Sequence, residues 1–161
     1  MITENKKNSN TNKVNLARSV ARLSAVQTLY QIGFNNVTAE ESISHFTSIA
    51  PNEKSEDIHE KLHDIDEEFY KKLVTGTQSL VTEINEILDD SLDESWPIDR
   101  MEILLLTILR CGLYEIIIHK EIPPAVLISE YMTISDSFFS GKESALVNAI
   151  LDKLAKKLRL E

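Results

Sequence analysis

Apolar side chains recur every three or four residues along most of this chain, which is the spacing of one face of an α-helix. The first such run extends from Val14 to Gly33, where the glycine ends it, and the last extends from Ser140 through Leu158. Between these runs the pattern predicts a short helix over residues 40–50 and a helix over 125–137. Residues 58–87 are expected to form one helix or two, because Gly76 lies within this stretch. A further helix is expected from about 96–99 to 119, with Asp99 as a candidate N-cap.

These segments predict an all-α fold, a single compact helical domain of about six or seven helices over residues 14–161. The only strand-like run, Ile116–Ile118, is too short and too isolated to form a sheet. Residues 1–13 lack apolar periodicity, so we expect a disordered polar and basic tail. The last helix is expected to start at a capping box, Ser140-Gly-Lys-Glu143. The expected core positions are Leu62, Phe69, Leu73, Ile84, Leu104, Ile108 and Ile150.

The composition is that of an ordinary globular protein, with 42% apolar and 27% charged residues. Four glycines and four prolines are too few for a β-sandwich or barrel with many tight turns. The single cysteine, Cys111, excludes an internal disulfide, fits a reducing cytoplasm and is expected to be buried and unreactive. The N-terminus lacks the apolar segment of a secretory signal, and the most apolar stretch, Ile103–Ile118, is too short to cross a bilayer. We therefore expect no membrane association.

The net charge of −9 is distributed unevenly along the chain. Residues 1–39 hold five basic side chains and one acid, a net +4, so the rest of the chain carries −13. Much of that negative charge falls within residues 40–68 and 83–102. A basic end on an acidic body can present one positive strip to a polyanion, although a solubilising tail would give the same pattern.

One segment matches a catalytic metal motif, because His59-Glu60-Lys61-Leu62-His63 fits H-E-x-x-H. Histidines four residues apart share a helix face and can hold one zinc ion while the glutamate activates water. A catalytic zinc needs a third protein ligand, and the residues that follow lack the downstream glycine and histidine of the metzincins. A small zinc hydrolase using His59, Glu60 and His63 is the alternative function from a different class. The other alternative is that both histidines lie on an exposed acidic helix.

Basic and aromatic residues of the kind that bind single-stranded RNA occur at two places. Arg18 and Arg22 are neighbours on one helical face and follow Lys13, so that together they can contact about two or three phosphates. The alternative is that the aromatic residues belong to the core and the arginines are only solvated. The residues assigned to this surface by type and spacing are Lys13, Arg18, Arg22, Tyr30, Phe138 and Lys142.

A series of short motifs extends over most of the chain. They are Ala17–Tyr30 (ARSVARLSAVQTLY), Phe69–Gly76 (FYKKLVTG), Trp96–Met101 (WPIDRM), Ile108–Glu115 (ILRCGLYE), Ile122-Pro123, Ile128-Ser-Glu130, Phe138–Gly141 (FFSG) and Leu146–Asp152 (LVNAILD). In their order and spacing, these motifs resemble the NusB family of bacterial transcription antitermination factors.

The resemblance implies an all-helical, cytoplasmic RNA-binding protein with no enzymatic activity and no cofactor. Members of the family pair with NusE, a small-subunit ribosomal protein, and bind boxA RNA in nascent ribosomal RNA leader transcripts. There they help to load an antitermination complex onto RNA polymerase. The family's arginine-rich first helix maps onto Arg18 and Arg22, and its following aromatic onto Tyr30. The loop and start of the last helix, also on the RNA side in the family, map onto Phe138, Lys142 and Asn148. A homodimer is left open.

Several positions depart from the family pattern, and each departure removes charge or an aromatic surface. They are Ser19 and Val20 in place of further arginines, Leu146 in place of phenylalanine, Ser129 in place of asparagine, and Asp136 in place of a basic residue. We therefore expect NusE to be needed to widen the basic surface. A related alternative is the RNA-binding module that the family resembles in ribosomal RNA cytosine methyltransferases, which requires a catalytic domain after residue 161.

Overall fold

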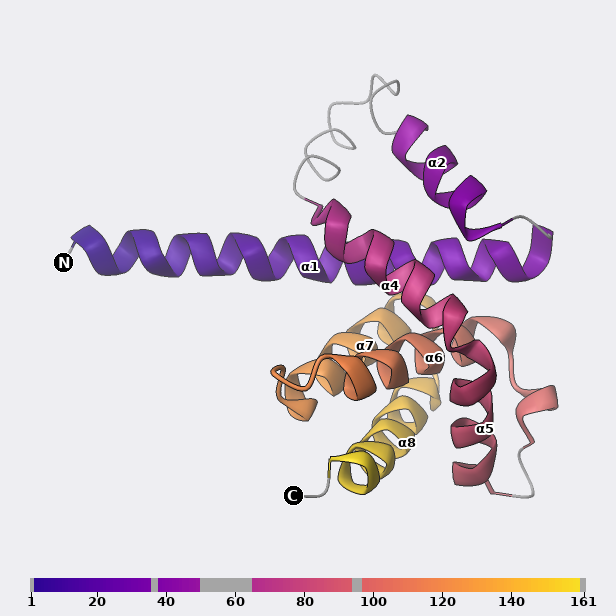
Figure 1. The fold of residues 1–161 in the computed structure, drawn as a ribbon. Helices are drawn as coiled ribbons and strands as arrows, with labels where there is room; N and C mark the ends of the chain where they lie inside the picture. The colour runs from indigo at the N-terminus through magenta and orange to yellow at the C-terminus, as the bar shows by residue number, and fades with distance from the viewer. Residues whose placement is uncertain (1, 36–37, 50–64, 94–96, 160–161) are drawn as a thin grey trace. The chain divides into compact units, whose positions relative to one another are not determined.

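The computed structural model describes residues 2–35, 38–49, 65–93 and 97–159, and over these ranges it contains helices and no strand (Figure 1). The all-α prediction is therefore confirmed. Packing divides the chain into two compact units, Met1–Val74 and Thr75–Glu161, which are described in turn; the prediction of one domain over residues 14–161 stays a prediction. The helices are α1 (Ile2–Asn35), α2 (Ala39–Ile49), α4 (Glu67–Ser79), α5 (Val81–Ser91), the 3-10 helix η1 (Ile98–Arg100), α6 (Ile103–Ile118), α7 (Pro124–Phe138) and α8 (Glu143–Leu158).

The first unit is built on the second half of α1. The start of α4 is joined to it by two hydrogen bonds, from the Asp66 amide to the Ala17 carbonyl (3.3 Å) and between the Thr28 and Tyr70 hydroxyls (2.6 Å). Helix α2 also packs on α1. Small residues on the buried face of α1 allow its neighbours to approach closely. The buried apolar residues of this unit are Ala21, Ala25, Val26, Leu29, Ile43, Tyr70, Leu73 and Val74.

Helix α1 begins at Ile2, whereas the sequence predicts a disordered tail over residues 1–13 and a helix from Val14. No proline or glycine occurs between residues 2 and 32, so nothing in the backbone chemistry ends the helix before Val14. All side chains from residue 8 to residue 16 are exposed, including those of Val14 and Leu16. Over residues 8–16, α1 therefore depends on its local backbone hydrogen bonds rather than on burial.

Helix α6 is the centre of the second unit. Eleven of its sixteen residues are buried, which identifies a helix covered on nearly all sides rather than an amphipathic surface helix. Helices α7 and α8 pack on α6 and on each other, and α5 packs on α6 and α8. Of the predicted core positions in the whole chain, Leu73, Ile84, Ile108 and Ile150 are confirmed as buried, Phe69 and Leu104 are half-buried, and Leu62 lies outside the described residues.

The long apolar stripe breaks into two helices after Ser79, not at Gly76. Gly76 lies inside α4, and the ring of Tyr114 occupies the space that a side chain at this position would need. A Cβ added to Gly76 would stand 2.7 Å from Tyr114 Cε2 and closer still to the Tyr114 hydroxyl. The glycine therefore permits a close helix contact and does not mark a turn.

The two N-caps predicted from the sequence, Asp99 and Ser140, are wrong. Helix α6 begins at Ile103 rather than near residues 96–99, and Asp99 lies within η1 instead of capping α6. The chain is extended at Met101, whose side chain is buried, so the helix cannot start until this residue has been passed. At α8, the carboxylate of Glu143 accepts a hydrogen bond from the Gly141 amide (3.1 Å), and Lys142 stands at the N-cap in place of Ser140.

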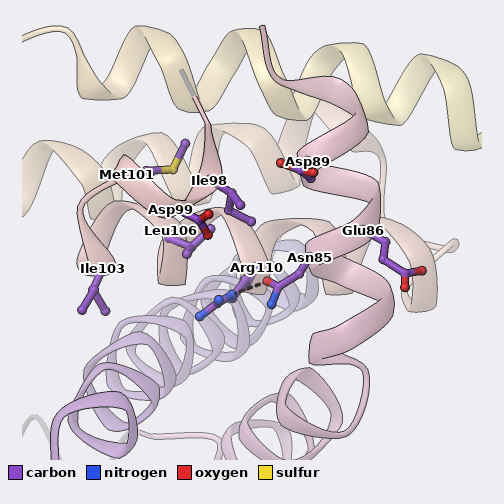
Figure 2. A pocket seen from close by; sticks show the side chains of 9 residues that line it. All are labelled: Asn85, Glu86, Asp89, Ile98, Asp99, Met101, Ile103, Leu106 and Arg110. Atoms are coloured by element: carbon purple, nitrogen blue, oxygen red, sulfur yellow. Dashed lines mark hydrogen bonds between the residues drawn. The ribbon is translucent and has the colours of Figure 1, made fainter. Parts of the chain in front are cut away.

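A groove of about 450 Å³ opens among α5, η1 and the start of α6 (Figure 2). At one end, Arg110 Nε donates to the Asn85 side-chain oxygen (2.8 Å), and burial lowers the pKa of Arg110. Carboxylates outnumber basic groups in the groove by three to one, so the lining attracts cations. The apolar lining residues are Ile98, Met101, Ile103 and Leu106, and the acidic ones are Glu86, Asp89 and Asp99.

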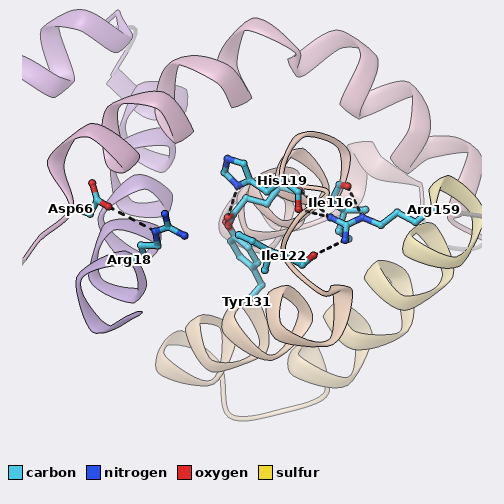
Figure 3. Close-up of polar contacts among 8 residues, drawn as sticks. Arg18, Asp66, Ile116, His119, Ile122, Tyr131 and Arg159 are labelled. Carbon is cyan, nitrogen blue, oxygen red and sulfur yellow. Dashed lines mark hydrogen bonds and ion pairs between the residues drawn. The ribbon is translucent and has the colours of Figure 1, made fainter. Parts of the chain in front are cut away.

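A buried polar network closes the C-terminal end of α6 (Figure 3). The Glu115 carboxylate is fully buried and accepts hydrogen bonds from the Tyr131 hydroxyl and from His119 Nδ1 (2.9 Å). The last carbonyls of a helix have no hydrogen-bond donor within the helix, and the guanidinium of Arg159, just after α8, supplies donors at the end of α6. It donates to the carbonyls of Ile116 (2.9 Å), His119 (2.9 Å) and Ile122 (2.6 Å).

Candidate nucleic-acid interface

The predicted RNA-binding residues on α1 differ in how accessible they are. Lys13 is exposed, and 41% of the Arg18 side chain is accessible to solvent. Arg22, which the sequence places beside Arg18 as a second phosphate contact, is only 3% exposed. Tyr30 is half-buried in the last turns of the same helix. Lys13, Arg18, Arg22 and Tyr30 on α1 form the predicted basic strip. In this strip Lys13 and Arg18 are the accessible cations.

The two arginines share one aromatic ring. The guanidinium carbon of Arg18 lies 5.2 Å from the centroid of the Phe69 ring, and that of Arg22 lies 5.1 Å from the same centroid. Both distances are within the range of cation–π attraction. Phe69 therefore links two cations that are one helical turn apart on α1.

Asp66 fixes the place of Phe69 and of Arg18 together. One carboxylate oxygen accepts a hydrogen bond from the Phe69 amide (3.0 Å) and so caps α4, while the other lies 3.9 Å from Arg18 Nε (Figure 3). The Arg18 Nε atom is buried and makes no hydrogen bond. The Asp66 amide is in turn bonded to α1 through the Ala17 carbonyl. The start of α4 is thus attached to α1 directly beside Arg18.

The Thr28–Tyr70 contact holds α4 against α1 nearer to Tyr30. Tyr70 is buried, and its burial raises the pKa of its hydroxyl, although the hydrogen bond to Thr28 partly offsets this effect. A neutral tyrosine hydroxyl in this position needs such a partner. The contact belongs to the support of the basic strip and was not predicted from the sequence.

The other predicted RNA-binding residues belong to the second unit. Phe138 ends α7 and is 39% exposed, and Lys142 stands exposed immediately before α8. Asn148 lies on the exposed face of α8, one turn before Asp152, which pairs with Lys156 (2.8 Å). All three side chains are therefore accessible around the α7–α8 connection.

Sequence reasoning missed Asp66 and Phe69 as parts of the basic strip. The apolar stripe predicts a core position for Phe69, and nothing in the sequence distinguishes Asp66 from the other acids around it. An aspartate directly before a helix is a recognisable N-cap signal. Nothing in the local pattern indicates that the capped residue will lie against arginines on another helix.

The zinc motif His59, Glu60 and His63 lies outside the described residues. Among the residues that the structure does describe, no group of three histidine, cysteine, aspartate or glutamate side chains could hold a metal ion. Cys111 is fully buried, as expected, and burial together with the nearby Glu115 carboxylate raises the pKa of its thiol. None of the helices within the described ranges is long and apolar enough to span a membrane.

Comparison with known proteins identifies the relatives of this chain. The sequence model of the NusB family matches residues 19–156. "Transcription antitermination protein NusB" of Bartonella quintana (strain Toulouse) is 37% identical over 148 residues, which are 89% of this chain and 90% of that protein. The protein of the same name from Bradyrhizobium sp. (strain ORS 278) is 36% identical over 155 residues, covering 93% of this chain and 88% of the relative.

Solved structures agree with the sequence relatives. T. maritima NusB has a TM-score of 0.67 at 25% identity, over 87% of this chain and 91% of that one. The solution structure of NusB from Aquifex aeolicus, at 23% identity and a TM-score of 0.68, supports the fold alone. The family is one of transcription proteins and not of enzymes. Because the family match and the relatives both extend over most of its length, this chain belongs to the NusB family.

Proposed function

We propose that this protein is a cytoplasmic transcription antitermination factor that works without catalysis. In this proposal it binds single-stranded boxA-type RNA of ribosomal leader transcripts together with NusE, and it helps to load an antitermination complex onto RNA polymerase. Family membership supports the general role, since the relatives are named transcription antitermination proteins. Neither alternative drawn from the sequence, the zinc hydrolase or the methyltransferase module, gains support from these relatives.

The observation that carries the proposal is the accessible basic strip on α1. Lys13 is exposed and Arg18 is partly exposed, and Arg18 is held over Phe69 with Asp66 beside it. Planar guanidinium groups suit phosphate recognition, and an aromatic residue farther along the same helix, Tyr30, can stack on an unpaired base. We assign Lys13, Arg18 and Tyr30 to RNA contact and Arg22 to their support.

The second unit supplies two further surfaces to the proposal. Phe138, Lys142 and Asn148 offer an aromatic face, a cation and an amide, which is a set that can bind a single strand by stacking and hydrogen bonding. The acid-lined groove between α5 and α6 would repel RNA phosphates and attract a basic protein. We therefore assign the groove to NusE and the α7–α8 connection to RNA.

The proposal is tested by fluorescence anisotropy with a labelled boxA leader RNA and a scrambled strand of equal composition. Each RNA is titrated with the protein, with and without NusE, at several salt concentrations. NusE should tighten binding of the boxA strand by about tenfold or more, which corresponds to roughly 1.4 kcal/mol of coupling. Replacing Arg18 with glutamine should weaken binding of both strands by similar factors, since phosphate contacts do not read bases.

Lys72→Gln is the matched control for Arg18→Gln. It removes one positive charge from an exposed side chain that pairs with Glu68 on α4 (3.0 Å) and belongs to neither proposed RNA surface. We expect it to leave RNA affinity near the wild-type value. Equal affinity for RNA with and without NusE would contradict the adaptor mechanism, and absence of binding in both conditions would contradict RNA binding itself.

A further inference from the structure

We infer that Phe69 is a positioning residue for RNA binding: its ring holds the Arg18 guanidinium in the orientation that contacts an RNA phosphate, and Arg22 acts through the same ring without touching RNA. The inference rests on the proposed function, because it concerns how the basic strip is organised. It assigns different roles to two arginines that their sequence positions would treat as equivalent.

The first step is the difference in accessibility between the two arginines. Their guanidinium carbons lie at nearly equal distances from the Phe69 centroid, 5.2 Å and 5.1 Å, yet Arg22 is 3% exposed and the Arg18 side chain is 41% accessible. A phosphate can therefore approach the guanidinium of Arg18 but not that of Arg22. The ring is therefore the element that both arginines share, and only Arg18 presents charge to solvent.

The second step is the orientation of the Arg18 guanidinium. Its Nε atom is buried and lies 3.9 Å from an Asp66 oxygen, so the inner edge of the fork is directed toward the start of α4. Any phosphate contact must then be made through the two terminal nitrogens. Because the planar group is held by a ring and a carboxylate, it has fewer orientations to lose when RNA binds.

The third step is the attachment of the ring itself. Phe69 donates its amide to Asp66, the Asp66 amide donates to Ala17, and the adjacent residue Tyr70 bonds to Thr28. The ring is thus fixed relative to α1 on both sides of the two arginines. Like charges four residues apart on a helix repel each other, and a shared electron-rich ring face offsets that repulsion.

The experiment compares Phe69→Leu, Phe69→Tyr and Arg18→Lys in the full chain, using the labelled boxA RNA at several salt concentrations. Leucine keeps an apolar side chain but removes the ring, so affinity should fall about three- to tenfold with an unchanged salt slope, since no charge is lost. Tyrosine keeps the ring face and should restore wild-type affinity. Arg18→Lys keeps the charge but not the planar group, and it should weaken binding as Phe69→Leu does.

A double-mutant cycle with Arg18→Gln separates positioning from a general effect on folding. Arg18→Gln should make the salt slope shallower by about 0.7, as expected for one lost contact on a single strand, and Phe69→Leu should then have no further effect. Arg22→Met should leave the slope unchanged. Circular dichroism and melting temperature are recorded for each variant. The Arg18→Lys variant keeps Phe69, so it tests the inference even if the Phe69 variants are destabilised.

Any of four results would overturn the inference while leaving the proposed function intact. Two are wild-type affinity in Phe69→Leu and wild-type affinity in Arg18→Lys. The others are an equal loss from Phe69→Leu with and without Arg18, and a shallower salt slope in Arg22→Met. If the wild-type protein does not bind the RNA at all, the proposed function fails instead. The two failures are therefore distinguishable in one set of titrations.

Discussion

Alanine in place of Gly76 tests the packing of α4 residues against α6 within the second unit. The new methyl group would lie 2.7 Å from Tyr114 Cε2 and nearer still to the Tyr114 hydroxyl, which is closer than real Cβ contacts come. Tyr114 is itself buried, so its ring has little free space into which to move. Either the ring or the helix must shift to accept the substitution.

The expected change is the difference between two terms of opposite sign. Alanine favours the helical backbone over glycine by about 1 kcal/mol. Overpacking a buried contact costs about 1–3 kcal/mol, and the closeness of the ring puts this case near the upper end. The free energy of unfolding should therefore fall by about 1–2 kcal/mol, which corresponds to a drop in melting temperature of roughly 2–8 °C for a chain of this size.

Urea denaturation of the single and double variants measures this effect. In a Tyr114→Leu background the ring atoms that meet the new methyl are absent, so Gly76→Ala should become neutral or stabilising. Gln78→Ala, at an exposed position of α4, serves as the control for helix propensity alone. Equal destabilisation by Gly76→Ala with and without the Tyr114 ring would refute the argument that the ring requires a glycine.

Three further predictions concern α6, α1 and the groove. Arg159→Met should lower the free energy of unfolding by about 2–3 kcal/mol in urea denaturation, because it leaves carbonyls at the end of α6 without their charged donor; Lys156→Met, on the exposed face of α8, should change it little. In hydrogen exchange, amides of residues 2–13 should show almost no protection while those of residues 21–29 are protected, because residues 8–13 have no buried side chain. Strong protection from residue 2 onward would show instead that the extension is stably helical. Asp89→Lys with Asp99→Lys should weaken NusE binding at least about tenfold while RNA affinity measured without NusE is kept; unchanged NusE binding would place that partner elsewhere.

The fold could be predicted where local periodicity decides it. The stripes that include Leu73, Ile84 and Ile108 are read directly from spacings of three and four residues, and all three side chains are buried. Helix boundaries depend instead on contacts with distant residues. The ring of Tyr114 packs against Gly76 in the interior of α4, and α6 begins only after the buried Met101. Neither feature is visible in a local window of the sequence.

The candidate site could be predicted only in its residue types. Arginine is usually exposed, so spacing alone assigned Arg18 and Arg22 to one solvent-facing strip. Arg22 is buried because Phe69 and its neighbours approach from α4, far along the chain. The same distance in sequence hides the pairing of Thr28 with Tyr70, since a hydroxyl on each helix has no local pattern that names its partner.

The accessible charge on α1 also bears on why a partner protein is expected. Surface charges farther apart than about 8–10 Å are largely screened at physiological salt, so the overall −9 matters less to a bound phosphate than the few side chains beside it. With Arg22 buried, Lys13 and Arg18 remain as accessible cations of the predicted strip. Two phosphate contacts to a single strand give a salt slope of only about −1.4, which is the slope of a weak electrostatic interaction. In the proposed function, high affinity for RNA is then expected to come from stacking, from Lys142 at the α7–α8 connection and from surfaces that NusE adds. The strip on α1 should orient the strand more than retain it.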